Sequence, residues 1–252
     1  MKKQYSDISD YERLAQHKEI WRQKESIRLI YNDYYELCCK YLQKPNKYNL
    51  ELGSGSGNFK EYFENIISSD IVFCEWIDVC FDAHNLSFKN NTFDNIVMFD
   101  VLHHLKQPLI FLDNVYNILK PRGRILILEP YASFFSNIIF KLFHPEPFDF
   151  DIDIFNKNIS AFASKSAFSS NQAISQMLFF KYREKFEKLY SDKFNIVFSE
   201  LLSFFAYPLS GGFENKNLLP TSLIKLLLKL EKNMTVFKYL FAFRCFVALE
   251  KK

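Results

Sequence analysis

One short stretch of the sequence, Glu51-Leu52-Gly53-Ser54-Gly55-Ser56-Gly57, decides the fold. A strand candidate over 48–52 runs into this stretch, and a helix is predicted over 58–65 directly after it. Glycine tolerates positive φ angles and lets the backbone come close to a ligand. Ligands of open parallel sheets bind beyond the carboxyl ends of the strands. The stretch therefore predicts a nucleotide-like ligand at a loop between a strand and a helix.

The spacing of the glycines narrows the class of ligand. A dinucleotide-binding loop needs G-x-G-x-x-G, but Asn58 stands where its last glycine would be, so the spacing here is G-x-G-x-G. A P-loop is excluded because no Gly-Lys-Ser/Thr follows. Glu51 precedes the first glycine by two residues, and its charge would repel a pyrophosphate. The same charge suits a ligand that carries cationic groups.

Short strand candidates alternate with helices around this loop. Such alternation is typical of a parallel sheet covered by helices. We therefore expect an α/β fold, a Rossmann-like seven-stranded, mostly parallel sheet with helices on both faces, a helical N-terminal extension and a lid insertion. The predicted strands are 48–52, 66–70, 76–81, 93–99, 124–128, 194–200 and 241–250; the predicted helices are 8–43, 58–65, 108–119, 172–189 and 223–232, with a turn at 120–123.

Two further carboxylates stand at the ends of the next two predicted strands. Asp70 ends 66–70, and Asp82 follows 76–81. A carboxylate at the first position can accept hydrogen bonds from ribose hydroxyls, and one at the second can accept from an adenine amino group. Either aspartate alone is equally well explained as a helix cap or a turn residue. Together with Glu51, at successive strand ends, they indicate one binding site.

Four segments, in this order along the chain, carry a family resemblance: ELGSGSG (51–57), DAHNLSF (82–88), FDNIVMFDVLHHL (93–105) and LKPRGRILILEPY (119–131). They resemble the class I S-adenosylmethionine-dependent methyltransferases, in particular methyltransferase type 11, the ubiquinone/menaquinone-biosynthesis-like branch. The resemblance covers roughly residues 48–130 and the two closing strands. Ser87 replaces a proline of the family pattern, and Arg122 replaces the first glycine of a Pro-Gly-Gly turn. Neither change removes a ligand-binding group.

The resemblance implies S-adenosylmethionine as the cofactor and a set of residues that bind it. Asp70 would hold the ribose, with Glu75 as a weaker rival. Asp82 and Ala83 would flank the adenine, and Phe99, Asp100 and His103 would lie near the transferable methyl group and the acceptor. The residues that would face the methionine part are Glu51, Gly53, Ser54, Gly55 and Gly57.

The expected layout is a single methyltransferase domain over 1–252. A helical cap over 1–46 precedes a cofactor-binding core over 47–130. After Pro130 the strand–helix rhythm changes, so 131–190 and 201–235 are predicted to be insertions that form a lid over the acceptor. The strands 194–200 and 241–250 then close the sheet.

Three histidines are candidates for catalysis. His103 and His104 follow the fourth strand, where the acceptor should arrive, and His144 lies with Glu146 in the insertion segment HPEPFD (144–149). A hydroxyl acceptor is helped by a general base, and histidine suits that role at neutral pH. The alternative, which we favour for His103 and His104, is that they shape the pocket, because the HHL segment occurs in family members with unlike acceptors. The alternative for HPEPFD is a proline-rich turn.

Composition and charge exclude several classes of protein. The net charge is +3 and the lysines are scattered, so no nucleic-acid partner is expected. Five cysteines without regular spacing argue against a disulfide framework and against a zinc site, so we expect no metal. The N-terminus lacks the apolar region of a signal peptide, and no run of about 18 apolar residues predicts a membrane span. A cytoplasmic location is the resulting expectation.

Two apolar segments that contain lysine, 134–143 and 223–232, have two interpretations. They are either helices that face the core or surfaces for an apolar acceptor or a peripheral membrane contact. The predicted function is methyl transfer from S-adenosylmethionine to a small-molecule or lipid-linked acceptor. O-methylation of a sugar, glycolipid or lipid-like metabolite is the expected reaction. The alternatives are a non-catalytic cofactor-binding or scaffold protein and, disfavoured by Asn58 and Glu51, a nicotinamide-dependent oxidoreductase.

Overall fold

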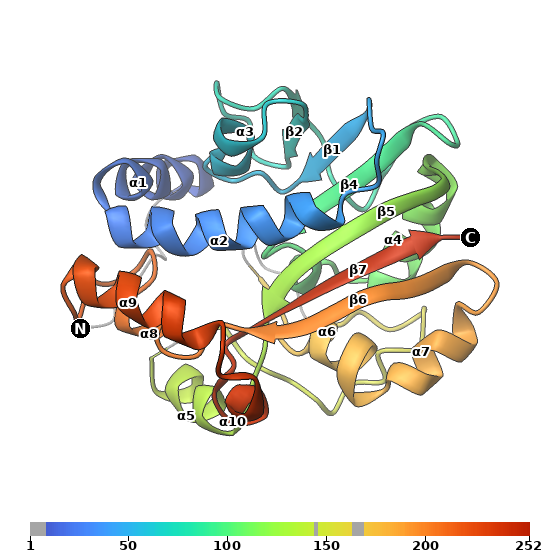
Figure 1. Ribbon diagram of the computed structural model, residues 1–252. Coiled ribbons are helices and arrows are strands. Elements are labelled where there is room, and N and C mark those ends of the chain that lie inside the picture. The colour runs from blue at the N-terminus through green and yellow to red at the C-terminus, as the bar shows by residue number, and fades with distance from the viewer. Residues whose placement is uncertain (1–8, 144–145, 163–168) are drawn as a thin grey trace.

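The computed structural model describes residues 9–143, 146–162 and 169–252, and its centre is a seven-stranded sheet (Figure 1). The strand order is β3-β2-β1-β4-β5-β7-β6, with β7 antiparallel to both of its neighbours and the other pairs parallel. This confirms the predicted fold class. The strands are β1 (Asn49–Leu52), β2 (Ile67–Asp70), β3 (Val79–Cys80), β4 (Phe93–Phe99), β5 (Leu119–Pro130), β6 (Phe194–Leu202) and β7 (Arg244–Lys251).

Helices cover both faces of the sheet, as the alternation predicted (Figure 1). A capping box between Ser9 and Glu12 begins α1, and Pro108 occupies the first turn of α4, where it needs no amide partner. The α-helices are α1 (Asp10–Gln23), α2 (Glu25–Tyr41), α3 (Asn58–Tyr62), α4 (Pro108–Ile118), α5 (Phe134–Phe143), α6 (Ile174–Gln176), α7 (Arg183–Leu189), α8 (Ala206–Leu209), α9 (Thr221–Glu231) and α10 (Lys238–Phe241). Single turns of other helix types are η2 (Leu102–His104), η3 (Met177–Lys181, π-helical) and η4 (Thr235–Phe237).

Several predicted boundaries differ from the structure. The helical region 8–43 is two helices, because Lys24 takes an extended conformation between them. The region 172–189 is likewise interrupted, by η3 and by Tyr182. The last strand begins at Arg244 rather than at 241, because α10 extends to Phe241.

Two predicted features around the first strands are also altered. Only Val79 and Cys80 of the strand predicted at 76–81 pair with β2. Residues 120–123, predicted as a turn, form a bulge inside β5: β4 pairs Phe93 with Leu119 and then Asn95 with Arg124. Arg122 within the bulge has a φ angle of 63°, the left-handed conformation that a turn glycine would adopt.

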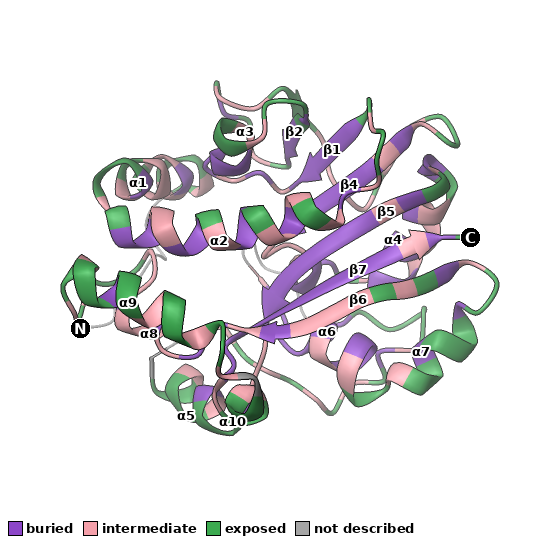
Figure 2. Ribbon diagram, in the orientation of Figure 1, coloured by how far each residue is buried: buried purple, intermediate pink, exposed green. Residues whose placement is uncertain are grey.

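Alternate residues of the central strands face two separate apolar layers. On β5, Ile125 and Ile127 point into a layer that includes α4, η3 and α7, while Leu126 and Leu128 point into a layer that includes α2. This period of two is the expected geometry of a strand that is buried on both faces, and Figure 2 shows the central strands buried along most of their length. The carboxyl ends of β1, β2 and β4 are thereby held on a rigid base.

The helices α5 and α10 lie beside each other below the start of β7 (Figure 1). The rings of Phe135 and Phe241 stack between them, with centroids 4.6 Å apart. Both helices also expose large apolar side chains, described further below. Within the described residues, no helix combines the length and the apolar character needed to cross a bilayer.

Candidate functional site

The loop after β1 has a backbone shape that requires glycine at two positions. Gly53 has a φ angle of +66°, and a Cβ added to it would lie 2.4 Å from Cγ2 of Val101. Gly57 has a φ angle of +75°, and a Cβ there would lie 2.9 Å from the Trp76 ring. Side chains at either position would be both strained and in collision. The loop therefore presents bare backbone at the carboxyl end of β1.

The same loop is hydrogen-bonded to β2. The Ser54 amide donates to the Ser69 carbonyl oxygen at 2.8 Å, and the Ser69 amide donates to Ser54 Oγ at 3.0 Å. The indole of Trp76 donates to the Gly55 carbonyl oxygen at 2.9 Å. Ser54, predicted to face a ligand, thus also fixes the loop to β2 through its hydrogen bonds with Ser69.

Glu51 is a buried carboxylate at the end of β1, with 3% of its surface exposed. Its Oε2 atom has no hydrogen-bond partner among the described residues. Burial raises the pKa of this carboxyl to about 7, because the charged form loses its hydration. A buried carboxylate oxygen without a partner is costly, so this position is suited to receive a cationic group.

Asp70 joins β2 to the glycine loop. Its Oδ2 accepts a hydrogen bond from the Gly55 amide at 2.8 Å, and its Oδ1 accepts one from the Val72 amide at 2.9 Å. A carboxylate offers about four acceptor positions, so two remain for ligand hydroxyls. The rival Glu75 is exposed and accepts from the Tyr11 hydroxyl at 3.1 Å. This geometry favours Asp70 over Glu75.

Asp82 lies beyond β3 in a small network that includes a histidine. Its Oδ1 accepts from the His84 amide at 2.9 Å and lies 2.7 Å from His84 Nδ1. His84 Nε2 accepts in turn from the Lys106 amide at 3.1 Å. Burial opposes ionisation of Asp82, but the hydrogen bonds from His84 outweigh it and lower the pKa of the carboxyl. The sequence alone gave His84 no role; the neighbouring Ala83 packs partly buried against the core.

Helix α1 lies over the glycine loop. Leu14 Cδ2 would lie 3.7 Å from a Cβ at Gly55, and Lys18 Nζ donates to the Ser56 carbonyl oxygen at 2.9 Å. Trp21 Nε1 donates to Glu61 Oε2 on α3 at 3.0 Å. The N-terminal helix therefore forms a cover over the loop at the end of β1.

Asp100, at the end of β4, has a φ angle of 59° although it is not glycine. Its carboxylate forms an ion pair with Arg244 Nη1, and Oδ2 accepts from the Tyr31 hydroxyl at 3.3 Å. Arg244 is buried and also donates to the Tyr207 hydroxyl at 2.8 Å. Backbone strain of this kind is frequent at functional sites. Arg244 had no role in the sequence-based predictions, although it is the single charge in the otherwise apolar run 240–249, which is a usable signal.

The ring of Phe99, next to Asp100 in the chain, lies in an aromatic cluster. It lies 5.1 Å from the Tyr35 ring and 5.0 Å from the Phe59 ring, measured between centroids. These contacts lie on the α2 side of the sheet. The structure therefore places the Phe99 side chain in the packing that supports the site.

His103 is held between two glutamates. Its Nδ1 lies 2.6 Å from Oε2 of Glu129, which is fully buried at the end of β5, and its Nε2 lies 3.7 Å from Oε2 of Glu146. The other oxygen of Glu129 accepts from the amides of Val101 and Leu102 at 2.8 and 2.7 Å. Burial alone would lower the pKa of His103, but the charge of Glu129 and its hydrogen bond raise it to about 9.

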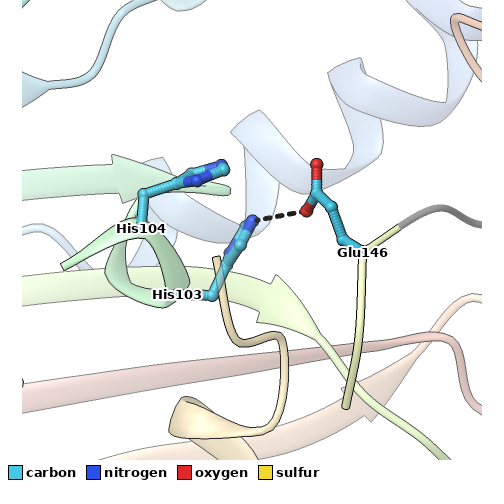
Figure 3. Close-up of side chains that lie close together, drawn as sticks. All are labelled: His103, His104 and Glu146. Atoms are coloured by element: carbon cyan, nitrogen blue, oxygen red, sulfur yellow. Dashed lines mark ion pairs between the residues drawn. The ribbon is translucent and has the colours of Figure 1, made fainter. Parts of the chain in front are cut away.

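His104 and Glu146 complete this cluster (Figure 3). His104 Nδ1 lies 3.1 Å from the Ser169 carbonyl oxygen, and burial lowers the pKa of its imidazole to about 4. Glu146 Oε2 accepts from Ser170 Oγ at 2.8 Å and from Gln172 Nε2 at 2.9 Å. One ligand atom each from His103, His104 and Glu146 lies within 4.8 Å of the others. Such a group can transfer protons or hold a metal ion; the third predicted histidine, His144, lies outside the described residues.

Comparison with known proteins places this chain in a family. Residues 22–194 match the profile of a family described as a methyltransferase domain. The chain belongs to this methyltransferase family. Its class is that of the S-adenosylmethionine-dependent methyltransferases, as the four sequence segments predicted. The narrower branch suggested by those segments stays a prediction.

Solved structures show the same methyltransferase fold. A structure titled as a SAM-dependent methyltransferase from Archaeoglobus fulgidus superposes with a TM-score of 0.52 at 18% identity, over 92% of this chain and 99% of that one. The YcgJ protein from Bacillus subtilis superposes with a TM-score of 0.51 at 13% identity, over 88% and 98% of the two chains. At these identities the similarity concerns the fold alone.

One curated protein matches this methyltransferase over a short stretch. It is described as a probable polyketide synthase 10 from Dictyostelium discoideum, and it is 39% identical over 67 residues. The match spans 27% of this chain and 3% of that protein's length.

S-adenosylmethionine is the cofactor that the family and the fold imply, and the residues of the site fit it. The cofactor carries an ammonium group on its methionine part, and the partnerless Oε2 of buried Glu51 suits that group. Asp70 keeps acceptor positions for ribose hydroxyls while holding Gly55. The bare backbone of the loop leaves room for a ligand to approach.

Proposed function

We propose that this methyltransferase methylates an oxygen atom of a small-molecule or lipid-linked acceptor, such as a sugar, a glycolipid or a lipid-like metabolite. The observation that carries the proposal is the buried cluster of His103, His104 and Glu146 beyond β4. A neutral amine or a thioether attacks through a free lone pair and needs no base, whereas a hydroxyl must lose its proton. Burying polar side chains costs free energy of folding. Deprotonation of an oxygen acceptor is a function that would explain why this cluster is buried.

The residues before Pro130 would bind the cofactor. Glu51 would accept from its ammonium group, the loop at Gly53, Ser54, Gly55 and Gly57 would line its methionine part, and Asp70 would hold its ribose. Asp82 and Ala83 would flank the adenine, with His84 keeping Asp82 in place. S-adenosylmethionine supplies an electrophilic methyl group: the carbon–oxygen bond forms as the carbon–sulfur bond breaks, and the hydroxyl proton is released.

The residues beyond the ends of β4 and β7 would orient the acceptor. Asp100 is fixed by Arg244 and Tyr31, so its carboxylate has a defined direction. His103 is fixed by Glu129 on one side and faces Glu146 on the other. An acceptor oxygen held between these groups would have a fixed angle of attack on the methyl carbon, and such positioning supplies a large part of catalysis. The cluster of His103, His104 and Glu146 would remove the proton.

The segments 131–190 and 201–235 are proposed to be the lid over the acceptor. Glu146, Ser170 and Gln172 belong to the first segment, and they contact one another beside His103. Gly211 and Gly212 of the second segment form a turn whose Gly212 carbonyl oxygen accepts from Lys24 Nζ. The contact of the first segment with His103 and that of the second with Lys24 support this proposal.

An apolar surface on α5 and α10 supports a lipid-linked acceptor. On α5, Phe134 is 64% exposed and Leu142 is 63% exposed. Val236 on η4 is 83% exposed, and Tyr239 on α10 is 65% exposed. Apolar side chains that gather on an exposed surface can mark an interaction site, and a lysine lies on each helix. Of the two interpretations of 134–143, contact with an apolar acceptor or a membrane surface is therefore the one we propose for the exposed face.

The cellular location proposed is the cytoplasm. All five cysteines lie in the described residues and are free thiols, of which Cys38, Cys74 and Cys245 are buried. Buried free thiols are typical of a reducing compartment. The proposal would be contradicted by oxidised cysteines in protein isolated from its own cells under alkylating conditions.

The test is release of S-adenosylhomocysteine in the presence of a panel of acceptors. The panel contains free sugars, glycolipids in mixed micelles, quinone precursors and hydroxylated polyketides, the last because of the short match to a polyketide synthase. We expect release with one oxygen acceptor and a lower kcat for His104→Gln, with His17→Gln as the matched control. Binding of S-adenosylhomocysteine without release for any acceptor would instead support the scaffold alternative. Methylation of a nitrogen or carbon acceptor alone would overturn the oxygen assignment.

A further inference from the structure

We propose that His103, His104 and Glu146 form a binding site for one divalent transition-metal ion, with Zn²⁺ as the ion that the donor set fits best (Figure 3). The sequence pointed away from a metal because the cysteines have no ligand spacing. The donors here are two adjacent histidines and a glutamate from the first insertion, which only the fold brings together. Among the described residues this is the one such group of histidine, cysteine and acidic side chains.

The distances suit an ion at the centre of the three side chains. Donor atoms about 2.1 Å from a tetrahedral ion lie about 3.4 Å from one another. His103 Nε2 and Glu146 Oε2 are 3.7 Å apart, and His104 offers a donor within 4.8 Å of both. Small rotations of the side chains would therefore complete the coordination. Figure 3 shows the three side chains converging from two separate segments of the chain.

The two histidines are also held from behind in the way that metal ligands are. His103 Nδ1 faces Glu129, and His104 Nδ1 faces the Ser169 carbonyl oxygen. When Nδ1 of a histidine donates its proton, Nε2 carries the lone pair that a metal binds. Ser170 and Gln172 both donate to Glu146 and fix its carboxylate. A simple ion pair between His103 and Glu146 would not require His104 to be oriented in the same manner.

The charges of the cluster favour a divalent cation. Glu129 is fully buried and the Glu146 side chain is 15% exposed, so two negative charges flank His103. A divalent ion bound by neutral imidazoles would balance the charges of these two carboxylates. Neutrality lowers the cost of keeping these groups out of water.

Imidazole and carboxylate donors select the kind of ion. Magnesium and calcium prefer all-oxygen sites, whereas two histidines and one glutamate are a known donor set of catalytic zinc with an open fourth position. A hydroxyl in that position would lose its proton more readily, because the ion lowers its pKa. This catalytic role rests on the proposed function, since it places an oxygen acceptor beyond β4. The binding of the ion does not depend on it.

The experiment uses tag-free protein stripped with a chelator and returned to chelator-free buffer. Zn²⁺ is titrated by calorimetry, and Co²⁺ is titrated by visible absorption, which reports coordination geometry. We expect one equivalent of either ion, with a cobalt spectrum typical of four or five nitrogen and oxygen donors. Absence of a one-equivalent site for both ions would overturn the proposal.

Two variants and one matched control locate the ion. His104→Gln and Glu146→Gln are each expected to weaken Zn²⁺ binding by about 100-fold or more. The control is His17→Gln, because His17 Nε2 lies 3.8 Å from Glu214 Oε1, a similar pair outside the cluster. His17→Gln should bind the ion like the wild type. Unchanged Zn²⁺ affinity in both cluster variants would refute the site. If a variant fails to fold, the cobalt spectrum of the wild-type protein tests whether nitrogen and oxygen donors coordinate the ion.

The outcomes for ion binding and for the proposed function are separable. Methyl transfer is measured with the metal-free and the zinc-loaded enzyme on the acceptor found in the panel. Zinc binding at one equivalent without transfer to any oxygen acceptor would support the metal site and contradict the proposed function. Transfer by protein that binds no ion would contradict the metal site and leave the proposed function standing.

Discussion

The Gly55 amide donates a hydrogen bond to Asp70 Oδ2 at 2.8 Å, so the end of β2 and the glycine loop form one hydrogen-bonded unit. Asp70→Asn removes the charge of this acceptor and leaves one oxygen where there were two. We expect the dissociation constant for S-adenosylhomocysteine to rise about tenfold to a hundredfold, as for the loss of a hydrogen bond to a charged group. Calorimetry measures the change. Glu75→Gln is the control and should bind normally; the reverse pattern would show that Glu75 holds the ribose.

Cofactor binding should depend on pH through Glu51. The pKa of this carboxyl is about 7 without ligand, and only its charged form attracts an ammonium group. Below this pH, binding must first expel a proton, so affinity should fall by up to about tenfold for each pH unit. Titrations of S-adenosylhomocysteine between pH 5.5 and 8 check this slope. Glu51→Gln should bind weakly with a flat profile, and a slope that survives in the variant would assign it to another group.

The same carboxyl should lower the stability of the ligand-free protein at neutral pH. Burial raises its pKa from 4.5 in the unfolded chain to about 7 in the folded one, so the folded state binds the proton more tightly. The stability that this proton provides is fully present below about pH 4.5 and is lost as the pH rises to about 7. Glu51→Gln should therefore be the more stable protein above pH 7, by at most about 3 kcal/mol. Urea unfolding at pH 4 and pH 8 measures the difference, which should nearly vanish at the lower pH.

Two glycines of the loop should tolerate alanine very differently. Both Gly53 and Gly55 have positive φ angles, which cost a side chain about 1 to 2 kcal/mol. At Gly53 the new Cβ would also lie 2.4 Å from Val101, whereas at Gly55 its nearest neighbour is Leu14 at 3.7 Å. Gly53→Ala should thus lose about 1 to 3 kcal/mol more unfolding free energy than Gly55→Ala. Equal losses would mean that Val101 can move aside freely.

The ion pair between Asp100 and Arg244 should stabilise the fold far more than an exposed pair. Arg244 has a side chain that is 6% exposed, so Arg244→Gln leaves a partly buried carboxylate without its cation. We expect a loss of about 3 to 5 kcal/mol, against less than about 1 kcal/mol for Arg183→Gln, which breaks the exposed pair with Glu187. Thermal unfolding of the two variants compares these losses. Similar melting temperatures would show that Asp100 finds another partner.

The sequence predicted best those elements whose signals are local. The strand β4 has the predicted bounds, Phe93–Phe99, because its apolar residues at 93 and 96–99 end at the polar residues Thr92 and Asp100. The strand predicted over 76–81 shrank to two residues, because Trp76 turns toward the Gly55 carbonyl oxygen instead of continuing the sheet. That contact depends on a loop more than 20 residues earlier in the chain, so no local pattern could indicate it.

The residues of the candidate site also fall into those with a local sequence signal and those without one. Glu51 and Asp70 were visible because strand ends and glycines mark them in the sequence. The partners of the other site residues were hidden by chain separation: Arg244 lies 144 residues from Asp100, and Glu129 lies 26 residues from His103. Such pairs arise from strand order, here the adjacency of β4, β5 and β7, which propensity does not encode.

The chain contains two tryptophans, and both lie beside the glycine loop. Trp76 donates to Gly55 within the loop, and Trp21 connects α1 to Glu61 on the helix that follows it. Intrinsic fluorescence of this protein therefore originates almost entirely from the surroundings of the predicted cofactor site. Excitation of these two indoles gives a label-free optical signal for ligand entry and for movement of α1, without contribution from tryptophans elsewhere in the fold.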